Sequence, residues 1–365
     1  MINFNNKRII SSLLYVLFIQ QNLIKYNKHG KIRTDLGGLI MNVLADEQKK
    51  LLESNLTEKE LEEKTQKYLD LYYKLRNEND KKFWSKLSLK QRQNIHWLIL
   101  SIYKLKNRIG GFSHEIIKDE RTNTNRPIIF AITHVGKFDI EVVSEAIRDH
   151  YYLLSGDYEH IQGIIDSPFI SLNGVFYFNE TVKSDRQEVS RKMISHLKSG
   201  GNLMYFIEGT WNITPNLPML PCYWGIVDVA KQGNAIIVPV AAEQYGKHFK
   251  INIGKNFDMN LYGDGNEEKS RAINDLRDTL STLKWEIWET EPQLKRNEII
   301  GDEWEKYVEE RFKEWPYFNE EYIKKLVYKP KNVATKEEVY GPIKKLVPNK
   351  NNAFLYNKRI KDEIF

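Results

Sequence analysis

The sequence predicts an α/β protein with a mixed, largely parallel sheet covered by helices, and with helical N-terminal and C-terminal extensions. From residue 112 onward, short β-rich runs alternate with helical stretches, which is typical of parallel strands joined by crossover helices. The runs are almost continuously apolar, as expected for strands covered on both faces. The chain has 365 residues, of which 41% are hydrophobic, so it can bury a large core.

Helical patterns fill the chain as far as about residue 107. Thr57 is a candidate N-cap of the stretch LTEKELEEKTQKYLDLYYKL, and Glu60 three positions later completes a capping-box pattern. A second helix, LKQRQNIHWLILSIYKLKNRIG, has a strong apolar stripe and should end at Gly110 and Gly111. We therefore predict a helical N-terminal region over residues 1–111.

Residues 9–24, IISSLLYVLFIQQNLI, are a notably apolar run within that region. The run is too short and too interrupted by Ser and Gln for a membrane span, and it lacks the small-residue cleavage site of a secretory signal. Two interpretations stay open. One is a helix that lies in the membrane interface, and the other is a helix packed in the core.

The α/β segment is predicted over residues 112–262. Strands are expected at 127–133, 175–179, 202–208, 235–245 and 247–257. Helices are expected at about 138–149, 184–199 and 225–232. Ser184 is a candidate N-cap for the second helix, and Gly200 with Gly201 should end it. GDGN at 263–266 is turn chemistry, after which helical patterns return in a C-terminal extension over residues 263–365.

Composition narrows the classes of function. The net charge of +6 fits anionic membrane surfaces or phosphate-bearing ligands. The sequence has no zinc knuckle, no RNP-type signature and no dense basic block, so no nucleic-acid partner is expected. Cys222 is the single cysteine, which excludes an internal disulfide and a cysteine-based metal cluster. The scattered histidines offer no ligand set, so we expect no metal, no cofactor and a cytoplasmic compartment.

A His followed five positions later by an Asp occurs twice. His114 and Asp119 belong to the charged stretch HEIIKD, which we interpret as a solvated segment ahead of the first clear strand. His134 and Asp139, in HVGKFD, directly follow the apolar strand PIIFAIT, and Gly136 permits a tight turn. Ligands of open α/β sheets bind outside the carboxyl ends of strands, so the context favours the second pair as a functional one.

The second pair suits acid–base chemistry. A carboxylate bonded to one imidazole nitrogen fixes the tautomer, and the other nitrogen can then deprotonate a hydroxyl. The sequence has no G-x-S-x-G motif that would supply a serine nucleophile. We therefore expect direct attack by an acceptor hydroxyl, without a covalent enzyme intermediate.

Further blocks follow along the chain. FIEGTWN (206–212) again places polar residues after an apolar strand: Glu208 and Thr210 can bind hydroxyls, and Gly209 allows close backbone approach. NGVFYFNE (173–180) is a strand preceded by a glycine, Gly174. IIVPV (236–240) has Pro239, which we expect to mark a strand end.

Taken together, H-x4-D, the glycine-led block NGVFYFNE, F-x-E-G-T and V-P-V in this order resemble the glycerolphosphate and lysophospholipid acyltransferase superfamily. The resemblance covers about residues 112–250. It implies an α/β acyltransferase domain that uses acyl-CoA or acyl carrier protein as co-substrate. It also implies that His134 is the general base, Asp139 its partner, and that Glu208 and Gly209 help to bind the acceptor. The acyl-donor side would then involve the blocks of Gly174 and Pro239.

The sequence departs from the family pattern at the phosphate-binding positions. The family's third block usually has F-P-E-G-T-R-S, whereas Ile207, Trp211 and Asn212 stand here for the Pro, Arg and Ser. The second block usually ends in an Arg, and here Glu180 follows Asn179. A planar guanidinium suits an acceptor phosphate, so both losses weaken the case for such an acceptor.

Other residues are then candidates for acceptor binding. Lys137 and Arg186 either replace the missing arginines or are surface charges, whereas we interpret Lys183 as a surface charge. Trp211 is suited to stacking on a sugar ring or an acyl chain. Thr210 completes the predicted acceptor set.

The sequence thus predicts an O-acyltransferase that acts by His–Asp general-base catalysis. Its expected acceptor is a lysophospholipid or related lipid, and the alternative acceptor is a glycolipid or polysaccharide hydroxyl. An alternative of another class is a non-catalytic lipid-binding or scaffold protein on the same fold. We expect a cytoplasmic protein in peripheral contact with the membrane.

Overall fold

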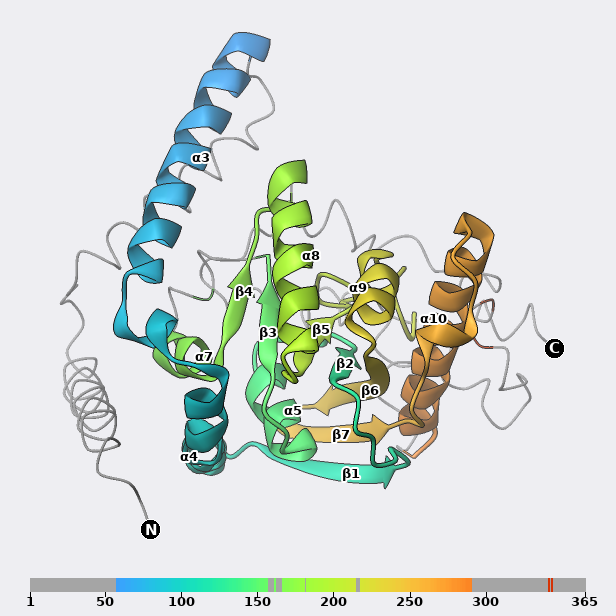
Figure 1. Ribbon diagram of the computed structural model, residues 1–365. Coiled ribbons are helices and arrows are strands. Elements are labelled where there is room, and N and C mark those ends of the chain that lie inside the picture. Colours follow the sequence, from blue (N-terminus) through green and yellow to red (C-terminus); the bar gives the residue numbers. More distant parts are fainter. Residues whose placement is uncertain are drawn as a thin grey trace. The chain divides into compact units, whose positions relative to one another are not determined.

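The computed structural model describes residues 57–156, 161, 166–180, 182–214, 217–290, 341 and 343 (Figure 1). The run 9–24 and the helices expected beyond residue 290 lie outside these residues. The chain divides into two compact units. The first includes the described residues up to Leu87 and those between 157 and 172, and the second includes Ser88–Gly156 and the described residues from Asn173 onward.

In the first unit, helix α3 (Glu58–Asp80) begins as its sequence predicts. The Thr57 side chain accepts a hydrogen bond from the backbone N–H of Glu60, and the Glu60 carboxylate accepts one from the backbone N–H of Thr57. The capping box is therefore confirmed. The 3₁₀ helix η2 (Phe83–Lys86) follows, and α7 (Ser167–Asn173) ends at the boundary between the units.

The second unit is built on a seven-stranded sheet with the order β1-β7-β6-β2-β5-β3-β4. The strands are β1 (Ser113–Asp119), β2 (Ile128–Ile132), β3 (Tyr152–Ser155), β4 (Val175–Tyr177), β5 (Leu203–Phe206), β6 (Ile236–Tyr245) and β7 (His248–Ile253). Only β6 and β7 pair antiparallel; every other neighbouring pair is parallel. The predicted mixed, largely parallel sheet is confirmed.

Helices pack on the sheet against side chains at alternating positions of its strands. Within the described residues, the helices of this unit are α4 (Leu89–Gly110), α5 (Asp139–Ile147), α8 (Lys183–Lys198), α9 (Gly225–Gly233) and α10 (Asn266–Glu289), with the 3₁₀ helix η3 (Met259–Leu261). Ile129 and Ala131 of β2 share one core cluster with residues of α8, α9 and α10. Further along, α10 packs on β6, and α4 packs against α5 (Figure 1).

Two strands were not predicted. HEIIKD is not a segment ahead of the sheet but most of β1, the edge strand, which pairs with β7. Its charged, mostly exposed side chains lack the alternation that identifies a half-buried strand, and charged residues are common on sheet edges. The strand β3 was missed because it is only four residues long, Tyr152–Ser155.

The predicted start of α8 is also wrong in one detail. The N-cap is Val182, which makes no side-chain cap, so Ser184 lies inside the helix. Asp185 in the first turn instead accepts a hydrogen bond from the backbone N–H of Asn179, at 2.6 Å. The carboxylate thereby ties the end of the β4 segment to the helix that follows.

Pro239 does not mark a strand end but lies inside β6, where it pairs with Ala131 of β2. Toward β7, its carbonyl accepts a hydrogen bond from the Gly254 N–H, at 2.9 Å, and the continuous ladder begins only at the next residue, Val240. A proline has no N–H to donate, so it is tolerated where the ladder toward one neighbour is interrupted.

The parallel register brings two strand ends to one edge. Ile132, the last residue of β2, pairs with Phe206, the last residue of β5. His134 and Glu208 each follow two residues later. Because the carboxyl ends of parallel strands meet at the same edge, polar residues 74 positions apart in sequence become neighbours.

Three buried histidines gather around Tyr152 at the start of β3. The rings of His150 and His196 lie 5.8 and 4.0 Å from that of Tyr152, and the ring of His96 lies 5.4 Å from His150. His150 and His196 are hydrogen-bonded to the carbonyls of Asn173 and Asn202. Burial lowers the pKa of His150 and that of His196 to about 4.

These histidines predict an acid-sensitive fold. An unfolded histidine has a pKa near 6.5, so between about pH 6.5 and 4 the unfolded chain binds protons that the folded chain does not, and stability falls as the pH falls. Urea unfolding at pH 7 and pH 5 should show this loss. It should be smaller by about 1 kcal/mol in His150→Gln, which keeps a donor for Asn173. The half-exposed His248→Gln should behave as wild type, and an equal loss in all three proteins would contradict the assignment.

Candidate active site

The turn after β2 brings His134 and Asp139 together. His134 Nδ1 lies 2.7 Å from Asp139 Oδ2. The Asp139 side chain is fully buried, whereas 18% of the His134 side chain is exposed. The imidazole therefore has one nitrogen fixed on a buried carboxylate, which is the geometry that orients a base.

Asp139 also organises the turn itself. Its Oδ2 accepts hydrogen bonds from the backbone N–H groups of Val135 and Gly136, at 2.9 and 3.2 Å. Asp139 is the first residue of α5, and a carboxylate is stabilised at a helix N-terminus. The same oxygen thus shapes the strand-to-helix turn and fixes the imidazole that the turn carries.

Glu208 joins three segments from a position inside the protein. Its Oε2 accepts a hydrogen bond from the backbone N–H of His134, at 2.8 Å. Its Oε1 accepts one from the backbone N–H of Leu220, at 2.8 Å, and one from the Asn212 side-chain amide, at 3.3 Å. Burial raises the pKa of Glu208, and the bonds from His134 and Leu220 oppose that rise. The carboxylate therefore holds the His134 backbone in place.

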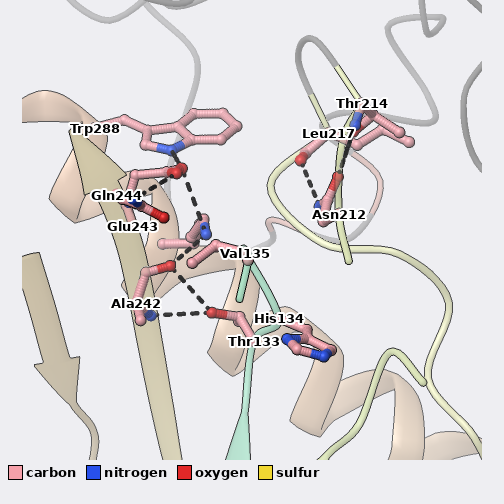
Figure 2. A network of polar contacts seen from close by, with 12 residues as sticks. Thr133, His134, Val135, Asn212, Thr214, Leu217, Ala242, Glu243, Gln244 and Trp288 are labelled. Carbon is pink, nitrogen blue, oxygen red and sulfur yellow. Dashed lines mark hydrogen bonds and ion pairs between the residues drawn. The ribbon is translucent and has the colours of Figure 1, made fainter. Parts of the chain in front are cut away.

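Asn212 reinforces this arrangement, although the sequence marked it only as a departure from the family pattern. Its backbone N–H donates to the His134 carbonyl at 2.7 Å. Its side-chain amide donates to the Leu217 carbonyl at 2.9 Å (Figure 2). Its Oδ1 accepts from the Thr214 hydroxyl. His134 is thus bonded through its N–H, its carbonyl and its ring.

Two aromatic side chains contact the imidazole. Phe206 stacks on His134 with ring centroids 4.2 Å apart, and Trp211 meets it edge-on at 6.1 Å. Only 6% of Trp211 is exposed, so it packs against the base and presents little free surface for stacking. Tyr223, which is 56% exposed, and Trp224 are exposed aromatic residues in the segment between Glu208 and α9, and no sequence motif marks them.

Gly209 has a conformation that requires glycine. Its φ is +70°, and a Cβ there would lie 2.3 Å from Cε2 of Tyr223. Tyr223 reaches this place because its backbone N–H donates to the Ile207 carbonyl, at 3.3 Å. The predicted close backbone approach at Gly209 is therefore made by Tyr223 of the same chain. Thr210, partly exposed, follows directly.

The cationic candidates lie apart from one another. Lys137 is in the turn itself, with its Nζ over the Phe138 ring at 5.3 Å. Arg186 is exposed in the first turn of α8, where its guanidinium donates to the carbonyl of Glu180. Lys183 is exposed, as expected of a surface charge.

The two residues predicted on the acyl-donor side do not join His134. Gly174 immediately precedes Val175, which pairs with Leu153 of β3, so it lies at the amino end of β4. When the strand pairing is followed from β4 through β3 and β5 to β2, Gly174 lies level with Ile129. Ile129 is five residues before His134, which is about 16 Å along the strand. Pro239 pairs with Ala131 within the sheet.

The assembled residues are equipped for proton transfer. The ring nitrogen of His134 that does not face Asp139 can accept a proton from a bound hydroxyl, and the carboxylate stabilises the imidazolium that results. Among the described residues, no three His, Cys, Asp or Glu side chains converge in a way that suits a metal ion. The site therefore consists of a histidine paired with a buried aspartate at the carboxyl end of β2, the central strand of the sheet.

Comparison with known proteins finds a family that the central segment resembles. Residues 114–243 match the family model described as Acyltransferase. This segment of the chain is therefore similar to the acyltransferase family, as its motifs predicted. The family match contains His134, Asp139 and Glu208 and ends at Glu243 of β6.

Individual similarities are more distant. An uncharacterised acyltransferase of Schizosaccharomyces pombe is 22% identical over 148 residues, which are 40% of this chain and 53% of the yeast protein. The match thus spans about half the length of that relative. The 1-acyl-sn-glycerophosphate acyltransferase PlsC of Thermotoga maritima aligns with 70% of this chain and 95% of its own, with a TM-score of 0.44 and 14% identity. Among the described residues, no helix is long and apolar enough to cross a membrane.

The contact between Gly209 and Tyr223 predicts the effect of a single methyl group. Gly209→Ala should lower the free energy of unfolding by about 1–2 kcal/mol, because it adds a left-handed backbone penalty to a clash with Tyr223. Gly200→Ala is the matched control, since Gly200 has a φ of +85° and open space around its Cβ position. Denaturant unfolding should show the larger loss at Gly209, and the difference should vanish in a Tyr223→Ala background. Equal losses in the presence of Tyr223 would contradict the clash.

Proposed function

We propose that the protein is an O-acyltransferase in which His134 acts as the general base. The observation that carries the proposal is the 2.7 Å contact between His134 Nδ1 and a fully buried Asp139, within a segment similar to the acyltransferase family. His134 Nε2 takes the proton of an acceptor hydroxyl as its oxygen attacks the thioester carbonyl carbon. The carbon–sulfur bond then breaks, and the proton passes from the imidazolium to the departing thiolate.

The rigid attachment of His134 supports this role. Its backbone N–H, its carbonyl and its Nδ1 are bonded to Glu208, Asn212 and Asp139. A base that is held in one orientation needs no reordering when the substrate arrives, and such positioning supplies a large part of enzymatic rate enhancement. In this proposal Glu208 is a positioning residue for His134, because its oxygens are engaged by backbone and amide donors.

The acyl donor of the proposal is acyl-CoA or an acyl carrier protein, and the acceptor is a lysophospholipid or related lipid. The protein would meet these substrates as a peripheral protein at a membrane surface. The net charge of +6 supports contact with an anionic lipid surface. This attachment would allow a lipid acceptor to reach His134 without leaving the bilayer.

A second acceptor class, a glycolipid or polysaccharide hydroxyl, is favoured by the charge near the site. Glu180 occupies the place of one family arginine. Burial and, after it, the negative charge of Glu180 raise the pKa of Tyr223. Trp211 occupies the place of the other arginine and is packed against His134. A carboxylate and a buried indole are poor partners for a phosphate but tolerate a neutral acceptor.

A non-catalytic lipid-binding or scaffold protein is the competing hypothesis of another class. It predicts neither thioester cleavage nor any effect of His134 on it. The intact hydrogen bonds around His134 support the enzyme, because a protein that only binds lipid has no need of an oriented base. Slow hydrolysis of acyl-CoA without acceptor would separate the two hypotheses.

The chain contains its own control for the catalytic base. His134→Ala should lower acceptor-dependent thiol release from palmitoyl-CoA by about 10²–10⁴-fold, the usual contribution of a general base. His114→Ala should leave the rate within about twofold, because His114 belongs to the same H-x4-D spacing but lies in the edge strand β1. Thiol release followed with a chromogenic reagent, at matched protein folding by circular dichroism, provides the measurement. Equal rates in wild type and His134→Ala would favour the binding protein.

The acceptor class can be tested at Glu180. Glu180→Arg restores the charge that the family usually has there, so it should lower the KM for a 1-acylglycerol phosphate by about tenfold or more through a charge-assisted hydrogen bond. Glu180→Gln controls for simple loss of the carboxylate, and a neutral monoacylglycerol or glycolipid acceptor controls for the phosphate. If the wild-type enzyme already prefers the phosphate-bearing acceptor and Glu180→Arg gives no gain, the proposal of a glycolipid or polysaccharide acceptor is contradicted.

A further inference from the structure

A lysine with no exposed surface is hydrogen-bonded to β6, the strand that pairs with β2. Lys284 belongs to α10, beyond residues 114–243 that match the acyltransferase family. Its side chain is 0% exposed, and its Nζ lies 3.4 Å from Oε2 of the buried Glu243 on β6. Burying a lysine costs several kcal/mol unless it is paired and hydrogen-bonded, so this position is under a strong constraint.

The pair of Lys284 and Glu243 belongs to a larger network (Figure 2). Trp288, one turn further along α10, donates from its indole N–H to Glu243 Oε2 at 2.6 Å. Glu243 Oε1 accepts from the backbone N–H of Gln244 at 3.1 Å. Two residues of α10 therefore converge on one carboxylate of β6, at a position where β6 pairs with Lys250 of β7.

This network reaches the residue next to the proposed base. Lys284 Nζ donates to the Ala242 carbonyl. That carbonyl also accepts from the Thr133 hydroxyl, at 3.2 Å, and the Thr133 hydroxyl accepts from the Ala242 N–H, at 2.9 Å (Figure 2). Thr133 is fully buried and immediately precedes His134. Two hydrogen bonds, which meet at the Ala242 carbonyl, thus connect Lys284 to the side chain of Thr133, the residue before His134.

Lys284 also acts through charge. The ionisable groups that interact electrostatically with Glu208 come from three segments of the chain. They are His134 after β2, Cys222 before α9, and Arg277 and Lys284 on α10. Burial raises the pKa of Glu208, and the backbone hydrogen bonds from His134 and Leu220, followed by the positive charge of Lys284, oppose that rise. Arg277 and Lys284 are seven residues apart, so α10 presents both cations from one face.

We propose that Lys284 is a positioning residue for His134, and that α10 thereby supplies to this site a cation from outside the acyltransferase segment. The lysine fixes the β6 backbone to which Thr133 is bonded, and its charge favours the carboxylate form of Glu208, which accepts the His134 N–H. This proposal rests on the proposed function for its kinetic consequences but not for its electrostatic ones. A buried ion pair alone is weak evidence for stability, so the distinguishing property is the effect on Glu208.

Lys284→Met tests the proposal because methionine has a similar length and no charge. We expect kcat for thiol release at pH 7 to fall by about tenfold or more, since Glu208 is more readily protonated and then loses acceptor capacity. We also expect the acid limb of the pH–rate profile to move to higher pH by about one pH unit. Lys269→Met is the matched control on the same helix: Lys269 pairs with Asp228 at 2.6 Å and should leave both measurements unchanged.

A second variant separates positioning from folding. Lys284→Met leaves the Glu243 carboxylate buried without its lysine, so the single variant is at risk of misfolding. The double variant Glu243→Gln with Lys284→Met removes both charges and keeps an acceptor for Trp288. It should fold while the acid limb stays displaced. An acid limb restored to its wild-type position in the double variant would overturn the proposal, because Lys284 would then serve only to neutralise Glu243.

A spectroscopic titration keeps the test independent of activity. The carboxyl ¹³C signal of Glu208, assigned by its loss in Glu208→Gln, should titrate at higher pH in the double variant than in wild type. An unchanged titration would overturn the proposal even if transfer is observed. If wild type shows no acyl transfer, the proposed function fails, and a displaced titration still supports the role of Lys284.

Discussion

The arrangement of the site depends on the Glu208 carboxylate. It lies inside the protein, where a charge is costly, and it remains tolerable because backbone N–H groups of two segments and one side-chain amide donate to it. In return the carboxylate fixes the ends of β2 and β5 and the approach to α9. The amide groups stabilise the buried charge, and the carboxylate in turn holds the segments that carry these amides in place.

The surroundings of His134 follow the same principle. Asp139 is fully buried and bonded to the imidazole and to two backbone amides, so the turn and the ring orientation depend on one oxygen. Lys284 and Glu243 form a further buried pair behind the strand. The sheet end is therefore held by ionic and amide contacts on several sides. Such buried polar networks rigidify a protein when all their members are bonded.

The motif residues were predictable because each depends on local rules. A polar pair after an apolar strand, a glycine that needs a positive φ, and a capping box are recognised within a few positions of sequence. Asn212, Tyr223 and Lys284 could not be found in this way. Their roles arise from partners such as His134, Gly209 and Glu243, which lie in other segments, and no short pattern marks them.

The sequence by itself determined the class of fold, the capping of α3 and the likeness of the central segment to acyltransferases. These follow from side-chain periodicity and from motif order, which are properties of neighbouring residues. Only the tertiary structure decided that HEIIKD is an edge strand, that Gly174 lies at the opposite end of the sheet from His134, and that α10 brings a buried lysine behind the site. Strand order and register set these relationships, because they join residues far apart in the chain through backbone pairing that the local sequence does not specify.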